Sequence, residues 1–342
     1  MTTPIESTAR ALVAAGKGIL AADESTPTMA KRLAAVGLTS TEALRRDYRE
    51  ILFTTPDLGE HISGVILYDE TIRQRASDGR PFAELLEHAG VVPGIKVDAG
   101  TTPLAGFPDE VVTAGLDGLR DRLAEYAALG ARFAKWRAVI RIGAGRPSTT
   151  CVAANAQALG AYAALAQEAG LVPVVEPEVM MDGGHDIERC AEVTVTVLRE
   201  VYAELARHRV MLEGTLLKPN MVLPGQDSAQ VVDDRAVAAA TLSVLRQAVP
   251  AAVPGIVFLS GGQSDVQATA RLDALNRSGV QPWELSFSFG RALQAPVLRA
   301  WAGEPARTRA AHEALRHRAH LNGAARRGQY TSDLEALAPT GG

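Results

Sequence analysis

The sequence is poor in cysteine, with only Cys151 and Cys190 among its 342 residues. A chain of this length with two cysteines is not a small scaffold stapled by disulfides. We expect both to be free thiols in a reducing compartment. A basic and then apolar leader is absent from residues 1–10, so we expect no signal peptide and a cytoplasmic location. No apolar run approaches the roughly 20 residues that a membrane-spanning helix needs.

The sequence also lacks a large excess of charge. Lys plus Arg is 35 and Asp plus Glu is 39, which gives a formal net charge of −4. Binding of nucleic acid or membranes favours a strong positive excess, so we expect neither partner. An anionic ligand must therefore be held by a local cluster of cations. The content of 47% hydrophobic and 22% charged residues fits a folded chain with a large core.

Eight short apolar runs recur along the chain, and each ends in polar or glycine-rich residues. Such runs are typical of strands buried on both faces of a parallel sheet. Helical patterns alternate with them, which indicates an α/β fold. Because no run resembles a polar edge strand and no dinucleotide fingerprint follows the first, we predict a closed (β/α)8 TIM barrel. The runs span residues 18–22, 64–68, 93–97, 133–140, 172–179, 212–218, 255–259 and 283–289.

Helical patterns continue after the eighth run, over residues 292–301 and 306–325. Neither an internal repeat nor a low-complexity linker interrupts the chain. We therefore predict one domain over residues 1–342, with additional C-terminal helices and a flexible tail from about residue 331. The earlier helical patterns span residues 28–36, 41–53, 115–129, 155–169, 187–208, 229–248 and 264–278.

Ionisable residues gather where the predicted strands end, which is where barrel enzymes place their catalytic groups. Lys135 and Arg137 are two residues apart, as are Glu176 and Glu178, and such pairs share one face of a strand. A single strand-end charge is more often a structural ion pair. A buried cluster from five strands is costly unless it has a task. The other members of the cluster are Lys218, Lys96, Asp98 and Asp23.

A lysine among cations and carboxylates suits covalent catalysis on a carbonyl group. The pKa of a free lysine is about 10.4, and burial and neighbouring cations lower it. Lys135 and Arg137 are placed to act on Lys218 in this way. Lys218 would then attack a ketone and form a Schiff base, whose iminium eases cleavage of the bond one carbon beyond it. Glu176 suits the proton transfers of dehydration, and either Asp23 or Glu176 suits removal of the hydroxyl proton.

Two glycine-rich stretches, SGGQS (260–264) and SFGR (288–291), follow the last two predicted strands. Bare backbone N–H groups beside Arg291 favour a phosphate site, and barrels place phosphate sites there. A metal site is not indicated. His185 has no second His or Cys at ligand spacing, so a loop turn is favoured for it.

The sequence resembles the class I fructose-bisphosphate aldolases, the metal-independent kind. The resemblance implies reversible cleavage of fructose 1,6-bisphosphate to dihydroxyacetone phosphate and glyceraldehyde 3-phosphate in glycolysis and gluconeogenesis. It also implies that no metal or other cofactor is used and that the chain forms a homotetramer. The segments that carry it, in family order, are GKGILAADEST (16–26), GVILYDET (64–71), GIKVDAG (94–100), GLDGL (115–119), FAKWR (133–137), VEPEV (175–179), LEGTLLKPNMV (212–222), FLSGGQS (258–264) and FSFGRALQ (287–294).

The resemblance implies a role for each matching residue. Lys218 matches the Schiff-base lysine, Glu176 the general acid/base, and Glu178 a carboxylate near the lysine. Asp23 matches the residue that positions and deprotonates the substrate hydroxyl, and Lys135 the lysine that aids carbon–carbon cleavage. Residues matching the site for the phosphate next to the ketone are Ser260, Gly261, Gly262, Ser288, Gly290 and Arg291, and those toward the second phosphate are Ser25, Arg32, Lys96 and Arg137.

Three departures from the family pattern stand out. Pro27 and Thr28 follow AADEST where the family often has Gly-Ser, and Phe289 stands where tyrosine is common. The familiar animal enzymes end in a tyrosine that aids proton transfer in the three-carbon half-reaction. Here the last tyrosine is Tyr330, and the chain ends in two glycines. The preference between bisphosphate and monophosphate stays open.

Two other functions are compatible with parts of the pattern. A Schiff-base lyase or transaldolase acting on another sugar phosphate would share the barrel and the lysine, but the paired phosphate sites argue against it. A non-catalytic scaffold would be marked by loss of Lys218 or Glu176, and both are present.

The absence of a terminal tyrosine predicts a changed balance between carbon–carbon cleavage and the later protonation step. We expect a burst of aldehyde release followed by slow release of the ketone, measured by rapid quenching with separate assays for the two products. Equal rates of release for the two products would contradict this expectation.

Overall fold

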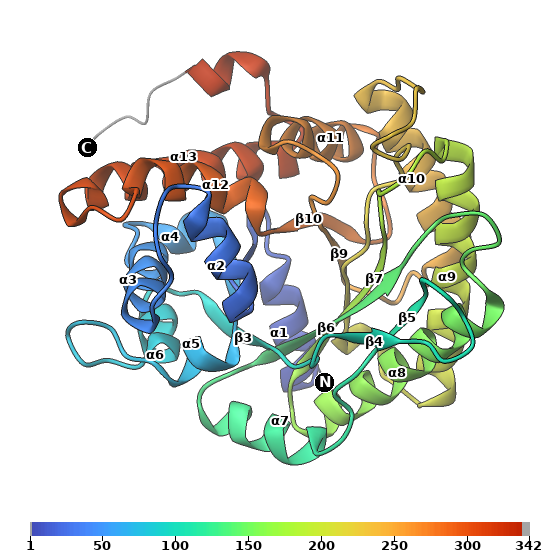
Figure 1. The fold of residues 1–342 in the computed structure, drawn as a ribbon, viewed down its shortest axis with the longest axis horizontal. Helices are drawn as coiled ribbons and strands as arrows, with labels where there is room; N and C mark the ends of the chain where they lie inside the picture. The colour runs from blue at the N-terminus through green and yellow to red at the C-terminus, as the bar shows by residue number, and fades with distance from the viewer. Residues whose placement is uncertain (1, 337–342) are drawn as a thin grey trace.

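A computed structural model describes residues 2–336 and shows a closed barrel of eight parallel strands surrounded by helices (Figure 1). The strands follow the order β1-β10-β9-β8-β7-β6-β3-β2 around the barrel. The predicted (β/α)8 barrel is therefore confirmed. The strands are β1 (Gly18–Ala21), β2 (Ile62–Leu67), β3 (Val92–Lys96), β6 (Phe133–Ile140), β7 (Val172–Val179), β8 (Leu216–Leu217), β9 (Gly255–Phe258) and β10 (Glu284–Phe289).

The region of the sixth apolar run differs most from its prediction. Only Leu216–Leu217 is strand, because Leu212–Gly214 forms a 310 helix before it. A second small sheet was not predicted. It pairs β4 (Thr101–Pro103) with β5 (Val111–Thr113) in an antiparallel arrangement beyond β3. Each of its strands has only three residues, and β4 is exposed, so neither produces a clear apolar pattern.

Helices cover the outside of the barrel, and several begin at a polar residue that caps the first turn. Ser148, Asp186 and Asp233 each accept a hydrogen bond from a backbone N–H in this way. The helices are α1 (Pro4–Leu12), α2 (Thr26–Ala34), α3 (Glu42–Phe53), α4 (Leu58–His61), α5 (Asp69–Arg73), α6 (Phe82–His88), α7 (Leu119–Ala128), α8 (Thr149–Glu168), α9 (Ile187–Arg207), α10 (Asp234–Ala248), α11 (Asp265–Arg277), α12 (Arg291–Trp301) and α13 (Thr308–Arg326). None of these helices is long and apolar enough to cross a membrane.

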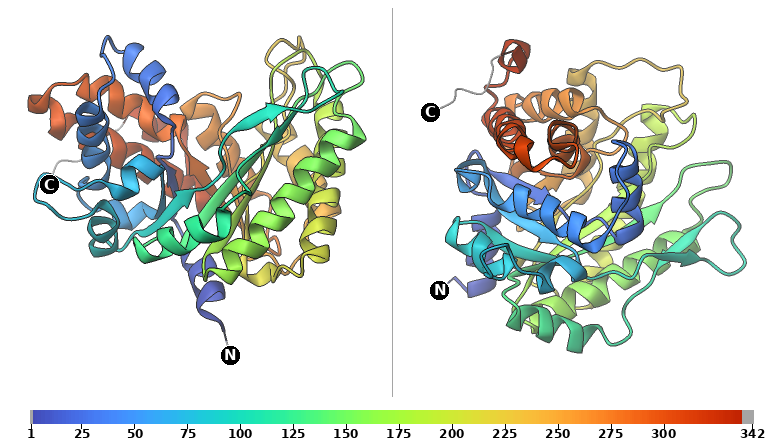
Figure 2. Two further views of the ribbon diagram at one scale, coloured as in Figure 1. Left: turned by 60° about the horizontal axis from the view of Figure 1, so that its bottom comes forward. Right: turned by 60° about the vertical axis from the view of Figure 1, so that its left-hand side comes forward.

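The barrel interior is packed with apolar side chains and closed at its amino end by α1, whose residues were not predicted to be helical. Leu12 packs with Phe133, Val174 and other inward residues of the strands. Figure 2 shows α1 projecting from the end of the barrel where the strands begin. At Gly94 an added Cβ would lie 2.3 Å from the Phe133 ring, so this strand position must lack a side chain.

The chain after α13 is held against the neighbouring helices. Ser332–Ala336 forms a 310 helix, and Glu335 forms a salt bridge with the buried Arg318. The Tyr330 hydroxyl donates a hydrogen bond to Glu335 over 2.8 Å. The remainder of the predicted tail, residues 337–342, lies outside the described residues, so its flexibility stays a prediction.

Arg326 links α13 to the amino end of the barrel through hydrogen bonds. Its side chain is 2% exposed, and its guanidinium group donates to the carbonyl oxygens of Val13, Ala14 and Leu285. Replacing Arg326 by Leu removes these buried hydrogen bonds, so we expect the free energy of unfolding to fall by about 3 kcal/mol. Urea unfolding followed by circular dichroism measures the change. The exposed Arg327, changed to Leu, is the matched control and is expected to cost under about 0.5 kcal/mol; equal losses would show that these hydrogen bonds are not the cause.

Candidate active site

A cleft of about 700 Å³ opens where the barrel strands end. Barrels carry their active sites at this face. Among the residues predicted from the sequence, all except Gly262 line the cleft. Those lining it are Asp23, Ser25, Arg32, Lys96, Lys135, Arg137, Glu176, Glu178, Lys218, Ser260, Gly261, Ser288, Gly290 and Arg291.

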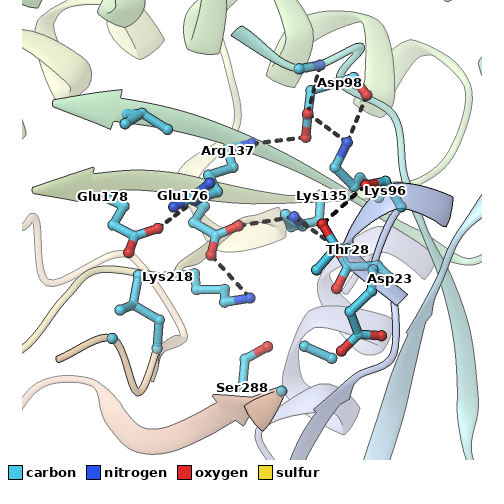
Figure 3. Close-up of a pocket in the computed structure, with 18 of the residues that line it drawn as sticks. Asp23, Thr28, Lys96, Asp98, Lys135, Arg137, Glu176, Glu178, Lys218 and Ser288 are labelled. Carbon is cyan, nitrogen blue, oxygen red and sulfur yellow. Dashed lines mark hydrogen bonds and ion pairs between the residues drawn. The ribbon is translucent and has the colours of Figure 1, made fainter. Parts of the chain in front are cut away.

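Four buried charges of alternating sign form a continuous chain at the base of the cleft (Figure 3). The Lys135 Nζ atom lies 2.7 Å from Asp23 Oδ2 and 3.1 Å from Glu176 Oε2. The other oxygen of Glu176, Oε1, lies 3.1 Å from Lys218 Nζ. Each of these side chains is at most 13% exposed. Glu176 thus bridges the two lysines, an arrangement that can pass protons between them.

Neighbouring strands bring these residues to one level. Lys135 lies on β6, Glu176 lies on the adjacent β7, and Lys218 directly follows β8. The parallel register pairs Arg137, two residues beyond Lys135, with Glu176. Asp23 reaches the same place from the loop after β1. Apolar residues in the strands therefore build the frame, and the polar residues near their ends meet at the cleft.

Neighbouring charges set the protonation states of Asp23, Glu176 and Lys135 in the cleft. Burial raises the pKa of Asp23, but Lys135 and Lys218 outweigh it and hold that pKa well below its usual range. Burial also raises the pKa of Glu176, and the same two lysines and Arg137 lower it overall. Burial lowers the pKa of Lys135, whereas Asp23, Glu176 and Asp98 raise it well above its ordinary value. Both carboxylates are therefore ionised and Lys135 is an ammonium group at neutral pH.

Two further ion pairs flank this chain. Arg137 donates to Glu178, and the Lys96 Nζ atom lies 2.7 Å from Asp98 Oδ1. Asp98 also accepts hydrogen bonds from the backbone N–H groups of Gly100 and Arg137. Asp98 was recognised in the sequence as a strand-end charge, but its role as the anchor of Lys96 was not.

One end of the cleft presents hydrogen-bond donors that have no partner in the described part of the chain. The Ser288 Oγ atom is buried and unpaired, and Arg291 has no carboxylate partner there. Gly261 allows the loop to approach closely, since a Cβ atom would lie 3.1 Å from Glu178 Oε1. Arg291 begins α12, so free backbone N–H groups of the first turn also lie here. These features suit a phosphate group.

Gly262 is not one of the residues that line the cleft, and its part in a phosphate site stays a prediction. Its φ of +75° is in the left-handed region, and an added Cβ would lie 2.8 Å from the Met181 side chain. Glycine is required at this position by the turn. Gly262 therefore shapes the loop that presents Ser260 and Gly261.

Glu24 is a buried cleft residue that the sequence reasoning missed. It forms salt bridges with Arg32 and with Arg49, and its Oε1 atom accepts a hydrogen bond from Gln294 over 2.7 Å. This network ties α2, which carries Arg32, to α3 and α12. Arg49 and Gln294 lie far along the chain from AADEST, so no local pattern could reveal this network. The other cleft residues that were not singled out include Tyr68, Thr101, Val139, Arg141, Met180 and Leu259.

The residues that depart from the family pattern have clear positions. Thr28 lines the cleft, and its hydroxyl lies 3.1 Å from that of Ser25. Phe289 is fully buried and contacts Phe287. Tyr330 is buried beside Glu335 and is not one of the cleft residues. Tyr330 therefore does not reach the cleft in this arrangement.

No group of three or more His, Cys, Asp or Glu residues with the geometry of a metal site occurs among residues 2–336. Cys151 and Cys190 are both buried. Burial raises the pKa of both thiols, to about 11 for Cys151. Neither cysteine lines the cleft.

The closed barrel and its charged cleft define the chain as a (β/α)8-barrel enzyme. A family model described as "Fructose-bisphosphate aldolase class-I" matches residues 4–340. The chain belongs to the class I fructose-bisphosphate aldolase family.

Relatives from distant organisms agree with this assignment. A protein of Xanthomonas axonopodis pv. citri named "Probable fructose-bisphosphate aldolase class 1" is 55% identical, over 95% of this chain and 98% of its own. "Fructose-bisphosphate aldolase 6, cytosolic" of Arabidopsis thaliana is 54% identical, over 94% of this chain and 89% of its own. A solved structure of the Plasmodium falciparum aldolase, in complex with TRAP and a small-molecule inhibitor, superposes with a TM-score of 0.95 at 46% identity, covering 96% of this chain and 95% of its own.

Replacing Lys135 by Met should destabilise the protein in a pH-dependent way. The variant leaves two buried carboxylates short of a cation, so we expect a loss of about 3 kcal/mol at neutral pH. The lowered pKa values of Asp23 and Glu176 contribute stability above the pKa of the unfolded carboxyls, about 4, and this contribution declines as the pH falls further. The gap between wild type and variant should therefore narrow below about pH 4 in urea unfolding experiments.

The matched control for this experiment is Lys31→Met, which removes an exposed lysine of α2. It is expected to change the free energy of unfolding little at any pH. If the Lys135 variant loses the same free energy at pH 7 and at pH 2, the loss comes from packing and the electrostatic account is wrong.

Proposed function

We propose that this chain reversibly cleaves fructose 1,6-bisphosphate to dihydroxyacetone phosphate and glyceraldehyde 3-phosphate through a Schiff base on Lys218. The observation that carries the proposal is the buried chain Asp23–Lys135–Glu176–Lys218 in a cleft with anion-binding groups. The family assignment supports the activity. The enzyme is accordingly an aldehyde-lyase of glycolysis and gluconeogenesis.

Schiff-base formation begins when the neutral amine of Lys218 attacks the ketone carbon. Its proton passes to the Glu176 carboxylate, which lies 3.1 Å from Lys218 Nζ. Glu176 passes this proton to the former ketone oxygen, which completes the carbinolamine. It then takes up a proton from solvent and donates it to the departing hydroxyl, so that water leaves and the iminium forms. Lys135 remains an ammonium group, because Asp23 and Glu176 raise its pKa.

Carbon–carbon cleavage requires a base for the hydroxyl group that becomes the aldehyde. Asp23 is ionised, since Lys135 and Lys218 hold its pKa low. Its carboxylate accepts the hydroxyl proton while the bonding electrons move toward the iminium and form an enamine. Lys135, 2.7 Å from Asp23, stabilises the charge that develops on the oxygen. Glu178, paired with Arg137, lies on the same face of β7 as Glu176 and keeps the site electrically balanced.

The two phosphate groups are held at opposite sides of the reacting bond. Ser260, Gly261, Ser288, Gly290 and Arg291 hold the phosphate next to the ketone through backbone and side-chain donors. Gly262 provides the turn of that loop. Cations and a hydroxyl toward the second phosphate are Ser25, Arg32, Lys96 and Arg137.

No metal or organic cofactor is required by this chemistry, because the iminium itself draws the electrons of the breaking bond. We place the enzyme in the cytoplasm, in line with the cytosolic form named in Arabidopsis. A homotetramer is expected from the family resemblance, with small sugar phosphates as the binding partners and neither nucleic acid nor membrane.

Reduction with borohydride in the presence of fructose 1,6-bisphosphate and EDTA should trap substrate on Lys218 and abolish activity. Mass spectrometry of peptides locates the adduct. The matched control is Lys31→Met, which should trap normally, whereas Lys218→Met should not. An adduct on Lys135 or Lys96 would reassign the nucleophile. Absence of an adduct together with loss of activity in EDTA would overturn the Schiff-base proposal.

A further inference from the structure

Met180 is a cleft residue to which the proposed reaction gives no role. It follows directly after β7 and lines the cleft. Its backbone N–H donates to the Ile140 carbonyl oxygen over 2.8 Å, which continues the β6–β7 pairing by one residue. Positions 176, 178 and 180 therefore share one face. Met180 thus presents a thioether on the same side as the two glutamates.

The thioether of Met180 contacts one of the cations of the cleft. The Arg137 Nη2 atom lies 3.5 Å from Met180 Sδ and donates toward it. The same guanidinium group donates to Glu178 through Nε (Figure 3). A thioether sulfur is a weak acceptor. Arg137 therefore keeps donor capacity for an incoming anion.

Met180 differs in exposure from most sulfur-containing residues of the described chain. It is partly exposed, whereas Met29, Met181 and Met221 are buried, at most 5% exposed. Met211 is also partly exposed, but it packs near Gly214 and does not line the cleft. The remaining sulfur atoms in the described residues belong to the two buried cysteines. A polar oxidant that enters the cleft therefore meets the sulfur of Met180.

We propose that Met180 is a site of reversible oxidation by peroxides and that its sulfoxide weakens binding of the bisphosphate substrate. The sulfur lone pair attacks one peroxide oxygen, and the O–O bond breaks. The thioether is oxidised to a sulfoxide, and the other peroxide oxygen leaves as water after taking up a proton. Methionine sulfoxide is polar and is reduced by methionine sulfoxide reductases.

The sulfoxide oxygen is a stronger acceptor than the sulfur that it replaces. It engages the guanidinium group of Arg137 and competes with a phosphate for the same N–H donors. This consequence rests on the proposed role of Arg137 at the second phosphate. Weakening one charge-assisted hydrogen bond raises the KM for fructose 1,6-bisphosphate roughly three- to tenfold.

Titration with hydrogen peroxide tests the inference in the full-length protein. Peptide mass spectrometry follows oxidation of each methionine, and steady-state kinetics follow KM and kcat for fructose 1,6-bisphosphate. We expect the rise in KM to track the fraction of Met180 sulfoxide and to reverse with methionine sulfoxide reductases A and B. M180L should show the same KM before and after treatment, each compared with its own untreated sample. The matched control, M211L, should respond like wild type.

Three outcomes would overturn the inference. They are modification of the buried methionines before Met180, full oxidation of Met180 with an unchanged KM, and an equal response in M180L. In each case the untreated wild type still cleaves its substrate, so the proposed function stands. If the untreated protein does not cleave the bisphosphate, the proposed function and this inference fail together.

Discussion

The buried chain of charges at the barrel mouth is the constraint on which the rest of the structure depends. An isolated ion in such a place is costly, so each member requires a neighbour of opposite sign at hydrogen-bonding distance. Lys135 has two such neighbours, and Glu176 shares its two oxygens between two lysines. The strands that carry these residues must therefore end at matching levels, which a closed barrel with fixed register provides.

The charged side chains at the centre of the cleft are paired with one another, whereas hydrogen-bond donors at one end of the cleft are free within the described part of the chain. The central charges satisfy one another, whereas Ser288 and Arg291 have no partner in residues 2–336. An anionic substrate is thus drawn to the end and not to the reacting groups. Arg137 is intermediate between the paired charges and the free donors. One of its N–H groups donates to the Glu178 carboxylate, and another meets the weakly accepting sulfur of Met180. In the proposed mechanism, chemical changes beside Arg137 therefore affect substrate binding more than the covalent steps.

Much of the fold could be predicted from the sequence because its strands are apolar and its loops are polar. Residues 133–140 and 172–179 match β6 and β7 at both ends. Residues 212–218 did not match β8, since a 310 turn there has the same apolar composition as a strand. The short helices α4, α5 and α6 have too few turns for a clear period. In the site, Glu24 depends on Arg49 and Gln294, and Asp98 on the Arg137 N–H, partners that only folding brings close. Gly262 depends on a backbone angle that a motif does not reveal.

Because α1 closes one end of the barrel, the two ends of the molecule differ in their access to solvent. The helix closes the floor of the barrel, at the opposite end from the cleft (Figure 2). A fusion partner or a surface linker joined ahead of Pro4 therefore leaves the mouth facing the solution. Coupling through amines is less suitable, because Lys96, Lys135 and Lys218 all lie in the cleft. For immobilised biocatalysis, the amino end is the natural point of attachment.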